Sequence, residues 1–252
     1  CIRDSYPSVI CGILLIPVMF ILGKQYKDEL TGLYCAGFAT IILPFIYYSQ
    51  FGRAYSMSLL CFAIALILYL RLKDGDNHLD IRVAFWAIVV VNLYVHLFAV
   101  IPLSIMCLDL ICDRKNWLCG TGAIIFSFPL VGMLVSVLST RTHSTFDYGA
   151  SALQMIVLTP MEFFNSVFLN IIVLAGVGAW LYKSEIKSRL VVITIITLIV
   201  GVVASVFTPF FPRYYMTVAL IILLFASVGI VKLTEILNAK TGNSLDYFVL
   251  IL

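Results

Sequence analysis

Long apolar runs separated by short polar loops dominate this chain. About 20 residues of helix cross the roughly 30 Å hydrocarbon core of a bilayer. Because a bilayer offers no partner to an unpaired backbone group, such runs are expected to be helices. The pattern predicts an all-α protein, a polytopic transmembrane helix bundle of about eight spans that forms a single domain over residues 1–252. The runs cover residues 7–22, 30–48, 55–71, 117–138, 163–182, 190–207 and 214–231.

A further apolar run, residues 84–111, is too long for one span, because its helix would be about 42 Å long. The run could form one tilted helix or two short helices. The two alternatives place every later loop on opposite sides of the membrane. With two helices hinged near His96, all but four of the 16 basic residues fall on one side, which the positive-inside rule makes cytoplasmic. A single helix would divide them almost evenly. We therefore predict two short helices, which with the seven runs above make nine apolar helices in the bundle of about eight spans. The four basic residues on the extracytoplasmic side are Arg3, Arg53, Arg141 and Arg213.

Composition and charge agree with this interpretation. The chain is 62% hydrophobic and 12% charged, more apolar than a soluble domain of 252 residues can bury. The basic residues predicted on the extracytoplasmic side are all arginines, whose planar fork suits phosphate or carboxylate. Tyr214 and Tyr215 are expected to be aromatic anchors at the membrane interface, and Asp109 a span-end residue facing basic neighbours. The seven cysteines are scattered without metal spacing, so we expect packing roles and no metal site.

The sequence contains no P-loop, no HExxH, no GxSxG and no dinucleotide glycine fingerprint. It does contain four polar blocks in a defined order: RDSYPSVICG at 3–12, YSQFGRAY at 48–55, a stretch from Trp86 that ends LYVHLFA at 93–99, and FPRYY at 211–215. Together these blocks resemble the membrane-embedded GT-C glycosyltransferases, in particular the protein-mannosyltransferase-like branch that uses polyprenyl-phosphate sugars. One departure is Phe51, where that family often has an acidic residue.

The resemblance implies a set of site residues on the extracytoplasmic face. Arg53 and Arg213 would bind the donor phosphate, and the catalytic carboxylate would lie in a loop upstream of Cys1, so the chain is expected to be a fragment that lacks the first span and that loop. No cofactor is certain, and the use of a divalent metal is left open. Weaker candidates for acceptor or metal binding are Asp147 and Glu162. Residues expected to line the cavity are Ser49, Gln50, Tyr55 and His96.

The implied function is transfer of a hexose, mannose or a related sugar, from a polyprenyl-phosphate sugar donor to a hydroxyl of a protein, lipid or glycan acceptor. The protein would be an integral, multi-pass membrane protein with no nucleic-acid partner. Two other functions stay open. A transporter or flippase would place charges near mid-membrane and use paired broken helices. A non-catalytic membrane subunit would retain the fold without the base.

Overall fold

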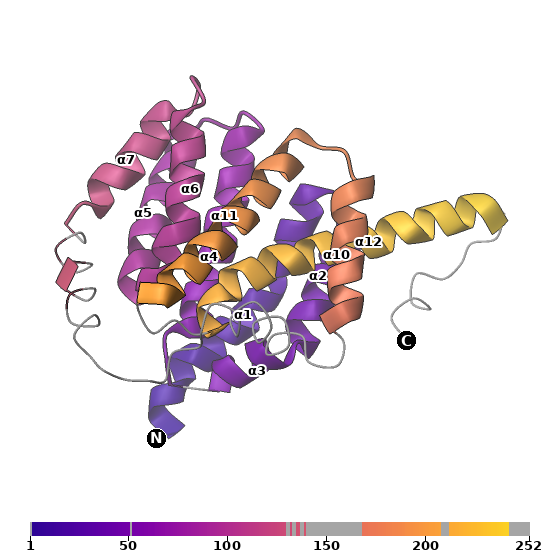
Figure 1. Cartoon of the computed structure of the whole chain (residues 1–252), viewed down its shortest axis with the longest axis horizontal. Helices are drawn as coiled ribbons and strands as arrows, with labels where there is room; N and C mark the ends of the chain where they lie inside the picture. The colour runs from indigo at the N-terminus through magenta and orange to yellow at the C-terminus, as the bar shows by residue number, and fades with distance from the viewer. Residues whose placement is uncertain are drawn as a thin grey trace.

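The computed structural model describes residues 2–50, 52–129, 168–207 and 212–241, with isolated positions between 132 and 139. This part of the chain is almost entirely helical and contains no strand, as the sequence predicted. Figure 1 shows α4, α5, α6 and α7 running side by side, while α12 crosses the molecule obliquely and extends beyond α10. The helices are α1 (Ile2–Tyr26), α2 (Glu29–Ile41), α3 (Leu43–Gln50), α4 (Tyr55–Lys73), α5 (Leu79–Val95), η1 (Leu97–Ala99), α6 (Val100–Ile111), α7 (Trp117–Ser127), α10 (Phe168–Leu181), α11 (Glu185–Phe207), η3 (Pro212–Tyr215) and α12 (Met216–Thr241).

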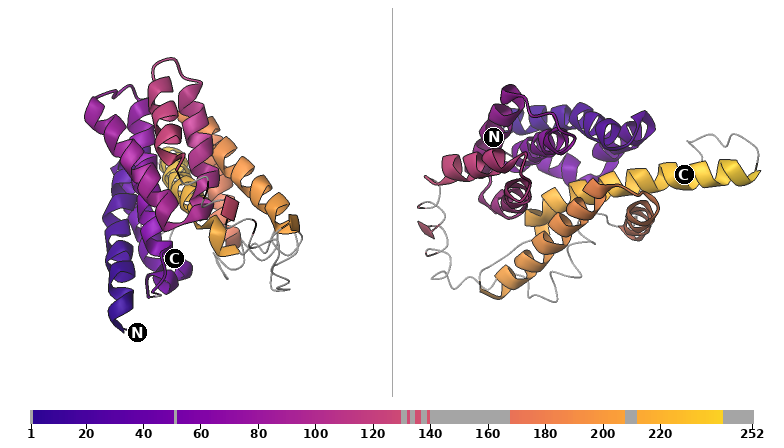
Figure 2. Two further views of the ribbon diagram at one scale, coloured as in Figure 1. Left: turned by 90° about the vertical axis from the view of Figure 1, so that its left-hand side faces the viewer. Right: turned by 90° about the horizontal axis from the view of Figure 1, so that it is seen from above.

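The apolar helices divide into central and peripheral ones. Of the most apolar stretch of each helix, 83% is buried in α12 and 72% in α4, but only 28% in α1 and 22% in α11. The outer helices turn aliphatic side chains outward, among them Ile13, Ile199 and Val203, each more than half exposed. Seen from above, α12 lies between α1–α2 and the pair α10–α11 (Figure 2). A helical bundle with apolar outer faces is compatible with an integral membrane protein.

Fewer helices than predicted are long enough to cross a bilayer alone. In the described residues four helices qualify, and a fifth span forms if the bent pair α2–α3 counts as one. Leu97–Ile111, Trp117–Ser127 and Asn170–Leu181 are apolar but shorter. The run predicted at 117–138 is described in full only to residue 129. The helical membrane class therefore agrees with the structure, whereas a count of about eight spans stays a prediction.

Two breaks in the helices bear on the predicted spans. The hinge predicted near His96 is confirmed, because α5 ends at Val95 and His96 has an extended backbone, with φ −151° and ψ 108°. The run predicted as a span at 30–48 consists of two helices, α2 and α3, which meet at 56° and together are long and apolar enough to count as one bent span. Ile42 is extended there, and Pro44, in the first turn of α3, cannot donate to the carbonyl four residues back.

Close glycine packing holds α10 against α12. A Cβ atom on Gly178 would collide with the carbonyl oxygen of Phe225 and lie 2.7 Å from the nitrogen of Gly229. A Cβ atom on Gly229 would meet the carbonyl group of Leu174, with 2.9 Å to its carbon. Both positions therefore need glycine, because the two backbones touch. Small residues at such crossings are typical of helices that pack within lipid, where dispersion contacts drive association.

In the turn between α1 and α2, one carboxylate both caps a helix and forms an ion pair. Asp28 is the N-cap of α2, and its carboxylate accepts hydrogen bonds from the backbone nitrogen and Oγ1 of Thr31, both at 2.7 Å. Lys27 Nζ lies 2.5 Å from Asp28 and 2.8 Å from Glu235 on α12. Burial opposes ionisation of Asp28, but the hydrogen bonds from Lys27 and Thr31 outweigh it and hold the pKa below the ordinary 3.8.

Asp28→Ala is expected to destabilise the protein by about 1 kcal/mol, because the first turn of α2 loses its cap. Asp28→Asn keeps an acceptor for Thr31 and should cost less. Since the folded pKa is depressed, the ionic contribution is present above the unfolded pKa and disappears as pH falls below about 4. Thermal unfolding of the purified protein in detergent at several pH values checks this. Equal stability of the alanine variant and the wild type would contradict the role of the cap.

Candidate functional site

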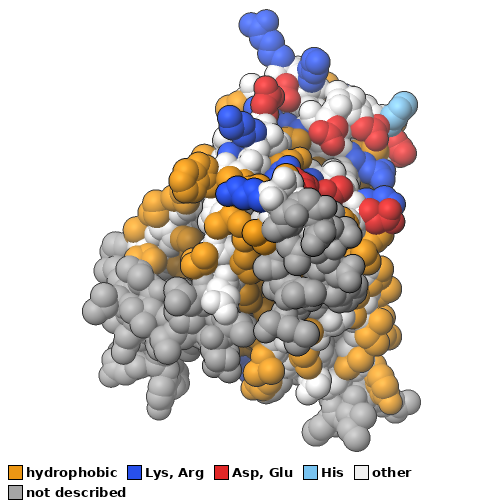
Figure 3. All heavy atoms as spheres, turned by 90° about the vertical axis from the view of Figure 1, so that its right-hand side faces the viewer, with side chains coloured by type: hydrophobic (Ala, Val, Ile, Leu, Met, Phe, Trp, Pro, Cys, Tyr) orange, Lys and Arg blue, Asp and Glu red, His pale blue; other side chains and the backbone are white. Residues whose placement is uncertain are grey.

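The two ends of the bundle differ in chemistry. Figure 3 shows Lys, Arg, Asp and Glu side chains gathered at one end, with hydrophobic side chains along the flanks. We call this the charged end; it comprises the loops at 26–29, 73–79, 111–117 and 181–185. Ion pairs of Lys27 with Glu235, and of Lys73 and Arg189 with Asp109, join elements there. The loops that charge counting assigned to the cytoplasm thus meet at one end, and Asp109 faces basic neighbours as predicted.

Aromatic rings from distant segments meet at the opposite end, which we call the aromatic end. Tyr55 begins α4, His96 directly follows α5, and Tyr214 lies in the 3₁₀ turn before α12. The imidazole centroid of His96 is 5.2 Å from the ring of Tyr55 and 5.8 Å from that of Tyr214. Phe98 stacks on Tyr214 with 3.9 Å between centroids, and Tyr48 contacts Tyr55 at 4.9 Å. The aromatic cluster consists of Tyr48, Tyr55, His96, Phe98 and Tyr214.

Helix ends determine this arrangement. The hinge at His96 turns the chain back, so α5 and α6 run side by side as a hairpin (Figure 1), and His96 lies at the start of its turn. Tyr55 is 8% exposed, while His96 and Tyr214 are half-buried and reach the surface. The cluster therefore presents a partly solvated imidazole between aromatic faces. A half-buried imidazole can donate or accept a hydrogen bond, and the rings offer flat apolar faces to a ligand.

The structure brings several predicted site residues to this end. Tyr55 and His96 are in direct ring contact. Arg53 is exposed one turn before α4, and its carbonyl oxygen accepts a hydrogen bond of 3.0 Å from Ser8 Oγ, which ties the segment to α1. Gln50, at the end of α3, is exposed, so its position does not bear out a cavity-lining role.

Arg213 and the two weaker candidates are placed less fully. Arg213 lies in η3 directly before Tyr214, so its backbone is next to the aromatic cluster; its side chain is outside the described part. Asp147 and Glu162 lie outside the described residues.

Ser49, a predicted site residue, lines a cavity. It is half-buried at the end of α3, and its Oγ donates to the carbonyl of Ile46 at 2.7 Å. The cavity has a volume of about 170 Å³ and lies between α1, α2, α3, α4 and the start of α12. Ser56 and Met216 also line it, and Gly12 leaves room for Ser49, since a Cβ atom there would lie 2.6 Å from that of Ser49.

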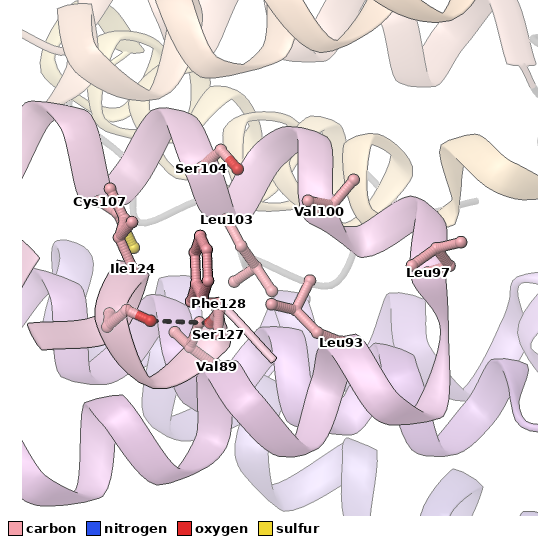
Figure 4. Close-up of a pocket in the computed structure, with 11 residues that line it drawn as sticks. Val89, Leu93, Leu97, Val100, Leu103, Ser104, Cys107, Ile124, Ser127 and Phe128 are labelled. Atoms are coloured by element: carbon pink, nitrogen blue, oxygen red, sulfur yellow. Dashed lines mark hydrogen bonds between the residues drawn. The ribbon is translucent and has the colours of Figure 1, made fainter. Parts of the chain in front are cut away.

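A second cavity of about 170 Å³ lies between α5, α6 and α7 (Figure 4). Its wall begins at Leu97, between His96 and Phe98 of the aromatic cluster, and continues past Leu103 to Cys107. Ser104 and Ser127 are the hydroxyl-bearing side chains among those that line it, and Ser127 Oγ already donates to the carbonyl of Ala123. A space with this lining suits a hydrocarbon chain better than a sugar.

No Asp or Glu side chain that the structure describes lies at the aromatic end; Asp4, in the first turn of α1, has its side chain outside the described part. The Asp and Glu side chains that the structure describes belong to the charged end. In the same residues no group of three or more His, Cys, Asp or Glu side chains could hold a metal ion. The described side chains thus provide an arginine, an imidazole, aromatic faces and apolar cavities. They can bind a phosphate and a flat or apolar ligand, but they contribute no carboxylate base.

Sequence reasoning missed some features of this end. Tyr215 was predicted to be an interfacial anchor, which was wrong: it is 2% exposed, and its hydroxyl donates to the carbonyl of Leu198 at 3.0 Å. Ser58 and Asn92 form a buried hydrogen bond of 2.7 Å about one turn inside the cluster. The sequence could have indicated this pair, because each of the two apolar runs contains a polar residue and a polar side chain buried in lipid-facing helices needs a partner.

Comparison with known proteins adds no relative: no protein-family model, no curated protein and no solved structure matches this chain. The class that fold and composition define is a helical bundle compatible with an integral membrane protein. Any narrower assignment rests on the residues themselves.

Proposed function

We propose that this chain belongs to a membrane glycosyltransferase that moves a hexose, mannose or a related sugar, from a polyprenyl-phosphate donor to an acceptor hydroxyl at the extracytoplasmic face. The observation that carries the proposal is the convergence of separate sequence blocks. The blocks at 48–55, 86–99 and 211–215, on which the resemblance to GT-C enzymes rests, supply the rings that meet around His96. Ser8, from the block at 3–12, bonds to the backbone of Arg53.

The two arginines act on the donor phosphate in the proposed reaction. Arg53, with Arg213, binds the donor phosphate through a charge-assisted fork. The acceptor oxygen forms a bond to the anomeric carbon while the bond from that carbon to the phosphate oxygen breaks, and the electron pair leaves with the phosphate. Cations beside the phosphate stabilise that charge. The acceptor proton passes to a carboxylate that the described side chains do not supply.

Exposed aromatic residues support a membrane position for the bundle. Tyr6, Tyr47 and Tyr94 are more than half exposed near the aromatic end, and Trp117 and Trp180 are 49% and 81% exposed near the charged end. The aliphatic outer faces lie between these two levels. Tyr and Trp favour the two interfaces of a bilayer, and basic loops favour the cytoplasm. In the proposal, the charged end is therefore cytoplasmic and the aromatic end extracytoplasmic.

Sugar transfer tests the proposal. Membranes or proteoliposomes containing the protein are incubated with labelled polyprenyl-phosphate mannose and an acceptor extract. His96→Ala is expected to reduce kcat/KM about 100-fold, and Arg53→Gln about 10-fold or more through weaker donor binding. The matched controls are His78→Ala and Arg114→Gln, which remove an exposed histidine and an exposed arginine at the charged end. Both controls should retain wild-type transfer.

Other outcomes distinguish the remaining functions. Movement of the labelled donor between leaflets without covalent transfer would identify a flippase. Neither transfer nor movement by a folded, full-length protein would identify a non-catalytic subunit. Equal transfer by His96→Ala and His78→Ala would remove the aromatic cluster from the mechanism, even if the protein were an enzyme.

A further inference from the structure

A third cavity opens at the charged end, away from the candidate site. Its volume is about 370 Å³, and it lies between the last turns of α1 and α4 and the turn that follows α4. This turn is tight: Gly75 has φ 94°, which glycine adopts without strain, and the nitrogen of Asp76 donates to the carbonyl of Arg71 at 3.0 Å. The residues that line the cavity are Ile21, Lys24, Gln25, Arg71, Asp74 and Asp76.

The cavity carries charges of both signs that do not neutralise each other. No described ion pair joins its cations, Lys24 and Arg71, to its carboxylates, Asp74 and Asp76. Lys24 instead lies 3.5 Å from Glu29, in a pair exposed to solvent, and Asp76 lies 3.9 Å from His78. Burial raises the pKa of Asp74 above 3.8, as is usual for a carboxylate that no cation stabilises.

The helices around the cavity are fixed relative to each other. Gln25 Nε2 donates to the carbonyl of Ile67 at 3.2 Å, a contact that joins α1 to α4 just inside the cavity. Lys24 and Arg71 are therefore held on neighbouring helices, while Asp74 and Asp76 come from the short turn. The fold thus places the two cations on the helices and the two carboxylates on the turn that follows α4.

An aliphatic stripe leads from the cavity along the outside of α1. Ile10, Leu14 and Ile21 lie on one helical face, because 7 and 11 residues correspond to nearly whole numbers of turns. Their side chains are 55%, 47% and 46% exposed. A molecule with a zwitterionic head and a hydrocarbon tail would place the head in the cavity and the tail on this stripe.

We propose that this cavity binds the headgroup of a zwitterionic phospholipid with a primary ammonium group, that is, a phosphoethanolamine lipid. Lys24 and Arg71 bind its phosphate, Asp74 and Asp76 accept hydrogen bonds from its ammonium group, and the aliphatic stripe contacts an acyl chain. An anionic glycerol headgroup would leave both carboxylates without a cation. A choline headgroup carries the positive charge but has no N–H to donate. The site lies at the opposite end from the candidate site and does not depend on the proposed glycosyl transfer.

Lipid retention tests the proposal without any activity assay. The full chain is reconstituted in an equimolar mixture of phosphatidylethanolamine, phosphatidylcholine and phosphatidylglycerol with identical acyl chains, and the lipids that survive mild detergent extraction are quantified by native mass spectrometry. We expect phosphatidylethanolamine to be retained about fivefold over each of the others, the scale of one solvent-accessible ion pair. The double variant Asp74→Asn/Asp76→Asn should lose this preference, and Arg71→Gln should lower retention of phosphatidylethanolamine itself.

Matched controls lie at the same end, outside the cavity. Asp80→Asn and Arg114→Gln remove one exposed charge of each sign and should retain the full preference. Equal retention of all three lipids by the wild type would overturn the proposal, as would a preference for phosphatidylglycerol. An unchanged preference in the Asp74→Asn/Asp76→Asn variant would also overturn it. Displacement of the retained lipid by an equal concentration of water-soluble glycerophosphoethanolamine would show that the headgroup alone accounts for binding, which would overturn the part assigned to the aliphatic stripe.

Discussion

Gly229→Leu is expected to destabilise the protein by about 3 kcal/mol or more, which is at the upper end of the cost of overpacking. The side chain would have to enter the contact between α10 and α12, where a Cβ atom at this position already collides with the carbonyl of Leu174. A flexible neighbour could move aside, but a helix backbone can only separate from its partner. That separation would open the most buried helix of the bundle, since 83% of the apolar stretch of α12 is buried.

A control on α10 isolates the effect of the contact. No atom lies within 4 Å of the Cβ position of Gly176, so Gly176→Leu introduces the same side chain into open space. Leucine also favours a helix over glycine by nearly 1 kcal/mol, so this control should match or slightly exceed the wild type. Thermal or denaturant unfolding in detergent measures both variants. A Gly229→Leu protein as stable as Gly176→Leu would contradict the close crossing of α10 and α12.

Asp109→Asn is expected to cost about 3 kcal/mol, because it leaves the buried ammonium group of Lys73 without its nearest counter-ion. Lys73 Nζ lies 2.6 Å from the Asp109 carboxylate and is 4% exposed; the hydroxyl of Tyr69 donates to the same carboxylate at 2.7 Å. Arg189 of α11 pairs with its other oxygen. One side chain therefore joins α4, α6 and α11. After the substitution Lys73 keeps only Asp113, at 3.5 Å, as an acidic partner.

An exposed pair at the same end is the reference for this prediction. Lys24 and Glu29 lie 3.5 Å apart with 55% and 69% of their side chains exposed, so Glu29→Gln should change stability by less than about 0.5 kcal/mol. Asp109→Glu retains the charge and should recover part of the loss. Unfolding in detergent separates the three variants. If Asp109→Asn behaved like Glu29→Gln, the network would make no net contribution to stability.

Charge counting predicted the hinge at His96 because the basic residues of a loop indicate on which side of a membrane that loop lies, independently of the local helix propensity. The same sequence contained the break at Ile42, which was not predicted. Proline is common in membrane helices, so Pro44 alone did not distinguish a kink from a straight span. The bend of 56° between α2 and α3 depends on how both helices pack against the rest of the bundle, which no single residue specifies.

The candidate site was predictable in part for a similar reason. Tyr55 and His96 stand at the ends of apolar runs, so a correct topology places them at one end of the bundle. The contact of His96 with Tyr214 requires α12 to begin next to the hinge, which depends on packing between segments far apart in the sequence. Glycines at 178 and 229 make the approach of α10 and α12 possible, but a glycine in an apolar run does not reveal its partner. The burial of Tyr215 was missed because an aromatic residue beside an arginine also fits an interface.

We propose that the aromatic end and the charged end face opposite sides of a membrane, with the candidate site outside. Cysteine labelling in right-side-out vesicles tests it directly, using a membrane-impermeant maleimide. Cys112, exposed in the turn after α6, marks the charged end, and Arg53→Cys in a Cys112→Ser background marks the aromatic end; Cys1 is replaced by serine in both. We expect Arg53→Cys to react in intact vesicles and Cys112 to react only after permeabilisation. Labelling of both cysteines from the same side, or of Cys112 alone in intact vesicles, would contradict the account.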